Sequence, residues 1–156
     1  MMDLRTFLCT EKTSVLNPTQ KLNVKHDITA LQYALDKSDH YPIIYVQSPE
    51  MLDGSNSKTP LVTNLTASRK LVAKSLGISD HKQAAATYGA RTSKNIKPTI
   101  VSVEEAPVHE ITFEKSSVNL LTLPALVQHT ADPGPYLTAA HATTYDPDTF
   151  VDNTAI

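Results

Sequence analysis

Apolar residues recur at helical spacing in the first 90 residues. Leu4, Phe7 and Leu8 follow the i, i+3, i+4 spacing of one face of a short helix. The same kind of periodicity predicts three further helices along this part of the chain. A residue able to accept a hydrogen bond from a free helical N–H precedes each of the four: Asp3, Asp27, Ser68 and Asp80. Gly77 is well suited to end the third helix.

Between and after these helices, the pattern changes to short apolar runs typical of strands. The β-branched run Ile43–Val46 predicts a buried strand, and residues 61–64 predict a second. Later stretches also look extended, and the last of them ends on an apolar residue: 99–103, 108–113, 136–144 and 149–156. The order predicts an α/β unit over about residues 1–95, a polar linker at 89–98 and then a β-rich region.

Composition narrows the function classes. The 156 residues carry a net charge of −2 without a run of Lys or Arg, so nucleic-acid and anionic-membrane binding have no electrostatic support. No apolar run is long enough to cross a membrane, and the N-terminus lacks the form of a signal peptide. The single cysteine, Cys9, is expected to be a small buried residue in a cytoplasmic protein.

The titratable residues form no recognisable catalytic or metal-binding motif. The six histidines make no H-x-x-x-H pair, so surface or capping roles are favoured over a metal site. The four glycines make no phosphate-binding loop. Glu104 and Glu105 would point to opposite faces of a strand, which favours solvated charges over an acid–base pair.

Two features near the C-terminal end of the sequence leave alternatives open. The rigid turn Asp132–Pro135 precedes a run of small residues, which would permit either a flat ligand or close sheet packing, and packing is favoured. Asn153 has an amide oxygen suited to Mg²⁺ or Mn²⁺, although a loop hydrogen bond is the more common role. A last strand that stops on an apolar residue predicts the opening part of a larger protein.

Five segments in order resemble the N-terminal portion of the UbiD family of decarboxylases. They lie at the first helix, the passage from strand to helix, the entry to the second domain, the Leu-Pro and Pro-Gly-Pro stretches, and the end: residues 3–8, 62–69, 106–110, 121–124 with 132–138, and 146–149 with 153–156. The resemblance implies an α/β N-terminal domain (1–95), a connecting extended segment (96–116) and the first strands of a split β-barrel cofactor domain (117–156), flavin-reductase-like.

The resemblance also implies a reaction and a set of ligands. UbiD proteins decarboxylate aromatic or α,β-unsaturated acids with prenylated FMN, a divalent metal such as Mn²⁺ and a monovalent cation such as K⁺. Asn153 would bind the divalent metal, and Thr154 would offer a carbonyl to the monovalent ion. Together with Ala155 and Ile156, these residues would line the cofactor. The family's catalytic arginine is expected two positions beyond Ile156, and its glutamates later still.

The sequence therefore predicts part of a carboxy-lyase that is inactive as this chain alone. The substrate of the complete enzyme would be a small carboxylic acid, and the expected assembly is a homo-oligomer. The alternative is a non-catalytic subunit or binding module that completes a partner chain, one that supplies the missing barrel, by strand addition.

Overall fold

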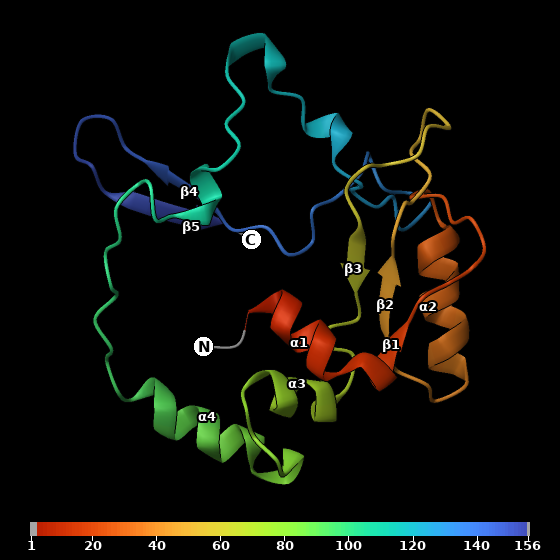
Figure 1. Cartoon of the computed structure of the whole chain (residues 1–156), viewed down its shortest axis with the longest axis horizontal. Helices are drawn as coiled ribbons and strands as arrows, with labels where there is room; N and C mark the ends of the chain where they lie inside the picture. Colours follow the sequence, from red (N-terminus) through yellow and green to blue (C-terminus); the bar gives the residue numbers. More distant parts are fainter. Residues whose placement is uncertain (1–2, 156) are drawn as a thin grey trace.

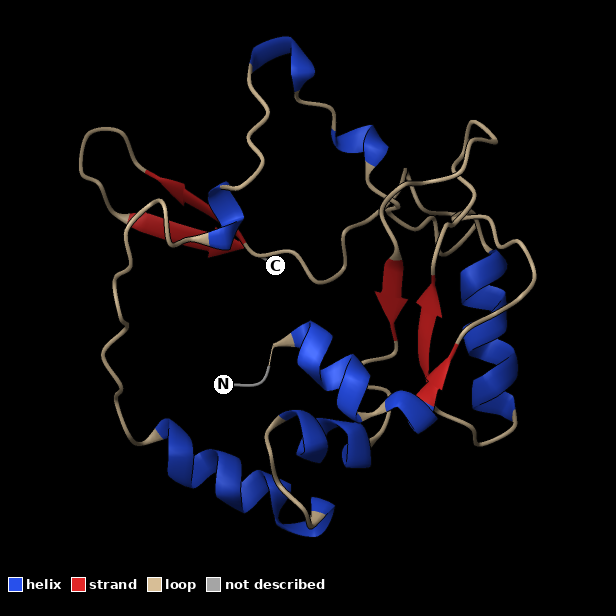
Figure 2. Cartoon of the chain, viewed as in Figure 1, coloured by secondary structure: helices blue, strands red, loops and turns tan. Residues whose placement is uncertain are grey.

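The computed structural model describes residues 3–155 and divides them into a compact part and an open part (Figure 1). The compact part is an α/β unit built from residues 3–92, which the chain touches again near residue 126. The open part runs from residue 93 to 155 and contains a two-stranded hairpin, short turns and long stretches without regular structure (Figure 2).

A three-stranded sheet forms the centre of the compact unit. Its strands are β1 (Val15–Leu16), β2 (Ile43–Val46) and β3 (Leu61–Thr63), in that order across the sheet. β1 runs parallel to β2, whereas β3 is antiparallel to β2. The predicted strands at 43–46 and 61–64 are confirmed, except that Asn64 already leaves the strand with a positive φ of 64°.

Helices cover both faces of this sheet (Figure 1). Helix α2 (Asp27–Lys37) packs on one face, where Ile28 joins Ile44 and Val46 in a buried cluster. Helices α1 (Leu4–Thr10) and α3 (Arg69–Ser75) pack on the other face. There, Phe7 and Leu71 contact Ile43. The alternation of side chains along β2 thus sends successive residues into two different cores.

The predicted caps and stop of two helices are confirmed. The Asp3 carboxylate accepts a hydrogen bond from the Thr6 N–H at 2.8 Å, and the Ser68 hydroxyl accepts one from the Leu71 N–H at 3.2 Å. Gly77 has a φ of 67° after α3, where the Gly77 and Ile78 N–H groups bond back to the carbonyls of Lys74 and Ala73 at 2.9 and 2.8 Å. This is the Schellman arrangement, in which a left-handed residue satisfies the last carbonyls of a helix.

The fourth predicted helix is longer than expected. The Asp80 carboxylate accepts from the Lys82 N–H and opens a 3₁₀ turn, η2 (His81–Gln83). The turn continues into α4 (Ala84–Thr92). The predicted linker at 89–98 is therefore wrong in its first four residues, because Gly89 lies inside a helix and is not followed by a break.

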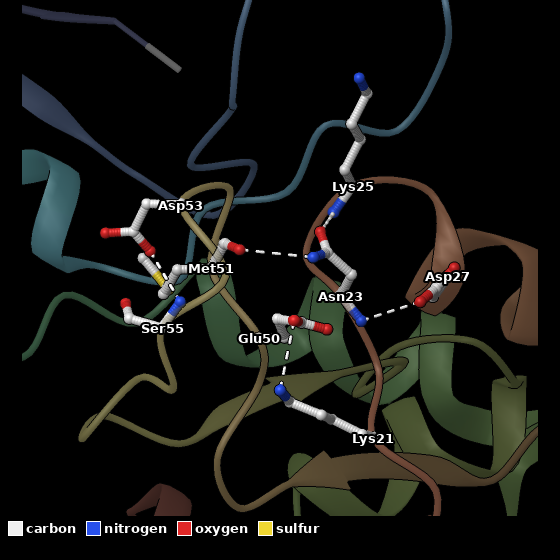
Figure 3. Close-up of polar contacts among 8 residues, drawn as sticks. All are labelled: Lys21, Asn23, Lys25, Asp27, Glu50, Met51, Asp53 and Ser55. Carbon is white, nitrogen blue, oxygen red and sulfur yellow. Dashed lines mark hydrogen bonds and ion pairs between the residues drawn. The ribbon is translucent and has the colours of Figure 1, made fainter.

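Asp27 does not cap α2, contrary to the sequence-based expectation. The N-cap is His26, with a φ of 73°, and the Asp27 carboxylate accepts the Asn23 N–H at 2.9 Å (Figure 3). The Asn23 side chain in turn accepts the Lys25 N–H at 2.8 Å and donates to the Met51 carbonyl at 3.3 Å. These contacts fix the segment before α2 against the turn that follows β2.

The chain returns to the compact unit at Leu126 and Val127. Leu126 is buried in the same cluster as Val24 and Ile28. The Val127 N–H donates to the Val24 carbonyl at 3.1 Å, and the Val127 carbonyl accepts the His26 N–H at 3.0 Å. A segment far along the sequence thus completes the core, while the division at residues 95 and 117 stays a prediction.

The rest of the open part buries little apolar surface. Its turns are η3 (Pro107–His109), η4 (Lys115–Ser117) and η5 (Leu120–Thr122). The predicted extended stretches at 99–103 and 108–113 form no strand among residues 3–155, and the second is wrong at its start, where η3 lies. The chain exposes 12499 Å², whereas a folded monomer of its mass would expose about 7,700 Å².

The fold class is confirmed at the level of mixed helix and strand. The open part contributes the hairpin of β4 (Ala142–Tyr145) and β5 (Asp152–Ala155). Closure of these strands into a split barrel stays a prediction. Within residues 3–155, no helix has the length and apolar character needed to cross a membrane.

Candidate functional site

The hairpin β4–β5 carries the residues that the sequence singled out. Its strands pair in antiparallel register, with Ala142 opposite Ala155 and Thr144 opposite Asn153. The predicted strand over 136–144 is wrong at its start. Tyr136 forms one isolated bridge to Leu126, and a turn follows it before β4 begins. The Pro-Gly-Pro segment therefore leads back to the compact unit before the chain enters the hairpin.

The turn of the hairpin is organised by Asp146. Its carboxylate oxygen Oδ1 accepts the N–H groups of Asp148 at 2.9 Å and Thr149 at 2.7 Å. These hydrogen bonds favour the ionised form and lower the pKa of Asp146 below its ordinary value. Phe150 follows with a φ of 57°, and its N–H donates to the Asp146 carbonyl at 2.9 Å. A left-handed residue after such a turn lets the strands keep their right-handed twist.

The pairing sorts the candidate residues onto two faces. Residues opposite one another share a face, and neighbours along a strand alternate. Asn153 and Ala155 therefore lie on one face with Ala142 and Thr144. Thr154 lies on the other face, where its hydroxyl is 2.8 Å from that of Thr143. Ile156, the last predicted cofactor residue, lies outside the described residues.

The Asn153 face fits one oxygen ligand and a flat group beside it. All eight residues of the two strands are exposed, and the neighbours of Asn153 on its face are small. Small side chains allow a ring system to approach the backbone, and an amide oxygen suits a hard cation. Asn153 would be a single ligand, because residues 3–155 contain no cluster of three His, Cys, Asp or Glu side chains placed to hold a metal.

The other polar candidates do not join this site. Cys9 is exposed on α1, so the expectation of a buried cysteine is wrong. Helix α1 buries only the face that carries Phe7, and Cys9 lies away from that face. Glu104 and Glu105 are exposed in a turn, where a backbone hydrogen bond lowers the pKa of Glu104. They remain solvated charges.

A groove of about 350 Å³ runs beside the edge of the central sheet, and the sequence alone did not reveal it. Three separate stretches form its walls: residues 59–63, 123–126 and 136–140. The only signals that could have indicated it are the Leu-Pro stretch and the small residues after the Pro-Gly-Pro turn. Those small residues line the groove.

A second cavity of about 340 Å³ lies where the chain returns to the α2 N-terminus. Its polar lining includes Lys25, His26, His129 and Asp132. The Asp132 carboxylate already accepts the N–H groups of Gln128 and His129, at 2.9 and 2.8 Å. The His26 Nε2 atom is buried without a hydrogen-bond partner among the described residues. Lys25 extends away from the Asn23 contacts (Figure 3).

Comparison with known proteins gives this arrangement a context. Residues 99–156 match the family model described as the 3-octaprenyl-4-hydroxybenzoate carboxy-lyase Rift-related domain, of the UbiD family. No protein of curated function matches the sequence.

Solved structures match nearly the whole chain. An evolved dimeric form of the UbiD-class enzyme HmfF from Pelotomaculum thermopropionicum, in complex with prFMN, matches with a TM-score of 0.80 at 24% identity over 99% of this chain. HmfF from the same organism in complex with FMN matches with a TM-score of 0.78 at 25% identity over 97% of this chain. The chain spans 35% and 33% of these two chains. The resemblance to the UbiD family is thereby confirmed.

Proposed function

We propose, from the relationship of this chain to the UbiD family, that it forms part of a carboxy-lyase that uses prenylated FMN. The substrates would be aromatic or α,β-unsaturated carboxylic acids. The observation that carries this proposal is the position of Asn153 on the small-residue face of an exposed hairpin, inside the segment that matches the family domain. Both HmfF structures that share the fold contain a flavin.

In this proposal, β5 supplies one edge of the cofactor site. The Asn153 amide oxygen would bind Mn²⁺ beside the cofactor phosphate, and the Thr154 carbonyl would be available to K⁺. Ala142 and Ala155 would leave space for the flat ring system. Prenylated FMN, when bound, supplies an acceptor for the electron pair left by loss of CO₂. The chain's own contribution is to position that group and to exclude water from one side.

The isolated chain should be inactive under this proposal. In this proposal Asn153 would be one metal ligand among several, and the eight residues of the hairpin strands are all exposed. Catalytic groups that act as a unit lose nearly all activity when one member is missing. We therefore expect neither flavin absorbance nor CO₂ release when residues 1–156 are co-expressed with a flavin prenyltransferase and tested on a panel of aromatic acids.

A second candidate function is a non-catalytic subunit that completes a partner chain. It is supported by the hairpin itself, since neither outer edge of β4–β5 pairs with another strand among residues 3–155. An exposed edge of this kind can add to a partner's sheet. Co-purification of a longer chain at fixed stoichiometry would favour this function.

A chimaera tests the proposed site directly. The chain would replace the corresponding third of HmfF, and the purified chimaera would be checked for folding by circular dichroism and for flavin by absorbance. We expect Asn153→Ala to lower flavin and Mn²⁺ content at least tenfold, because loss of even an outer-shell partner of a metal ligand typically costs that factor and Asn153 would bind the metal directly. Asn153→Asp keeps an oxygen ligand and should retain most of both.

Asn95→Ala is the matched control, because Asn95 is exposed and lies outside the hairpin. A folded chimaera that binds flavin equally well with Asn153→Ala would overturn the assignment of Asn153. Stoichiometric flavin on residues 1–156 alone would overturn the view that the site is shared with residues beyond this chain.

A further inference from the structure

The groove beside β3 has the form of a slot for one extended strand. All five residues from Thr59 to Thr63 line it. The last three form β3, and because side chains along a strand alternate between faces, three consecutive strand residues that line one groove indicate contact along the backbone edge. β3 is the last strand of the sheet, and its far edge pairs with no strand among residues 3–155. The groove therefore follows an open sheet edge.

The chemistry of the slot selects an uncharged occupant. Its lining contains no charged side chain and combines Leu, Pro, Ala, Val, Thr and Tyr residues. A charged side chain placed there would lose its hydration without gaining a partner. Alternate residues of an edge strand also present N–H and C=O groups outward, and an added strand satisfies them.

One segment of this chain matches the slot in length and composition. Residues 99–103 read Thr-Ile-Val-Ser-Val, without charge, and four of the five are β-branched. Ile100 is 94% exposed, and the segment pairs with no strand among residues 3–155. Lys97 and Pro98 come before it and Glu104 and Glu105 after it, a flanking pattern that restrains aggregation of exposed strands.

The charges beside the slot select one direction of pairing. With Val101 opposite Val62, an antiparallel strand places Glu105 opposite Lys58. A parallel strand in the same position places Lys97 opposite Lys58, and like charges directly opposite one another are destabilising. Lys58 and Glu105 are exposed, and the two ion pairs of the described residues involve neither of them.

We propose that two copies of this chain associate by exchanging residues 99–103. The segment of each copy would lie antiparallel to β3 in the slot of the other, with the exposed residues 93–98 as the hinge. Such a reciprocal exchange closes on itself in a two-fold dimer. The proposal does not depend on the proposed function, because it involves neither the hairpin nor a cofactor.

Disulfide trapping tests the exchange between separate molecules. In a Cys9→Ser background, one protein would carry Thr59→Cys and another Glu104→Cys, two positions that the antiparallel register places opposite each other. We expect the mixture to form the mixed disulfide dimer under mild oxidation. Ser117→Cys, which lies outside the exchanged segment, replaces Glu104→Cys in the control and should give at least tenfold less.

Equilibrium ultracentrifugation of the unmodified and substituted chains gives the affinity. Val101→Lys should weaken dimerisation at least tenfold, whereas Val108→Lys, which also changes an exposed valine but outside the segment, should leave it unchanged. Lys58→Glu and Glu105→Lys should each weaken it about two- to fivefold and restore it when combined in one chain.

Two results would overturn the proposal. One is a chain that stays monomeric at all concentrations with no trapped dimer in the mixture. The other is a disulfide that forms only inside a chain carrying both Thr59→Cys and Glu104→Cys, which would place the segment in the slot of its own molecule.

Discussion

Ile44 and Ile100 are the same residue type, in similar β-branched runs, with opposite surroundings. Ile44 lies on β2 and is fully buried at 0% exposure against α2, whereas Ile100 is 94% exposed in the open part. The two runs have comparable strand propensity, but β2 has neighbours on both edges and a helix on its face. The difference shows that strand propensity reflects packing opportunity more than an intrinsic backbone preference.

The first prediction compares the effect on stability of truncating a buried isoleucine and an exposed one. Ile44→Ala should lower the free energy of unfolding by about 2–5 kcal/mol, because it removes buried contacts and leaves a cavity. Ile96→Ala is the matched control: Ile96 is 90% exposed, and the change should stay within about 0.5 kcal/mol. Urea unfolding followed by circular dichroism measures both, and equal effects would contradict the division into compact and open parts.

The second prediction concerns two glycines with open space around them. An added Cβ would meet no atom within 4 Å at Gly77 or at Gly89. Gly77 has a φ of 67°, so Gly77→Ala should destabilise the compact unit by about 1–2 kcal/mol through backbone strain alone. Gly89→Ala should instead stabilise α4 by about 0.5–1 kcal/mol.

Thermal unfolding and the helical signal at 222 nm distinguish the two glycine changes. A loss of stability from both substitutions would show that crowding, and not the left-handed conformation of Gly77, determines the result.

The third prediction concerns the hairpin. Protonation of Asp146 should weaken the hairpin and leave the unfolding of the compact unit unchanged. The folded turn lowers the pKa of Asp146 below its ordinary value of 3.8. The turn is therefore stabilised above about pH 3.8 and loses that stabilisation as pH falls through the lower, folded pKa. Backbone NMR shifts of residues 142–155 should report less hairpin at acid pH.

Asp146→Asn is the control for this titration, because it keeps an oxygen that accepts the two N–H groups and removes the charge. The fraction of hairpin formed by this variant should not fall with pH in this range. A wild-type hairpin whose population stays constant down to pH 2 would contradict the role given to the carboxylate.

Local chemistry made much of the compact unit predictable. Asp3, Ser68 and Gly77 act within one turn of a helix, so their roles can be read from neighbouring residues. β1 was missed because it has two residues and exists through its pairing with β2. Asp27 was assigned as a cap because the sequence does not show that its carboxylate would instead accept the Asn23 N–H.

The candidate site was predictable to a smaller extent. The turn at Asp146 and the strand after it follow from residue type and spacing, and they are observed. The role of Asn153 came from the family resemblance and stays a prediction. The groove could not be predicted, because it requires three segments separated by up to about 80 residues to lie side by side.

The return of the chain at Leu126 and Val127 has a consequence for biosynthesis. The cluster around Ile28 lacks a buried member until residue 126 has been made, and the segment before α2 lacks two backbone hydrogen bonds until residue 127 has been made. Contacts between residues so distant in sequence slow folding, because the intervening chain must first be closed into a loop. The emerging polypeptide therefore carries an unfinished core until residue 127 has been made. During that time, a chaperone would find Val24 and Ile28 accessible, although both are hidden in the finished molecule.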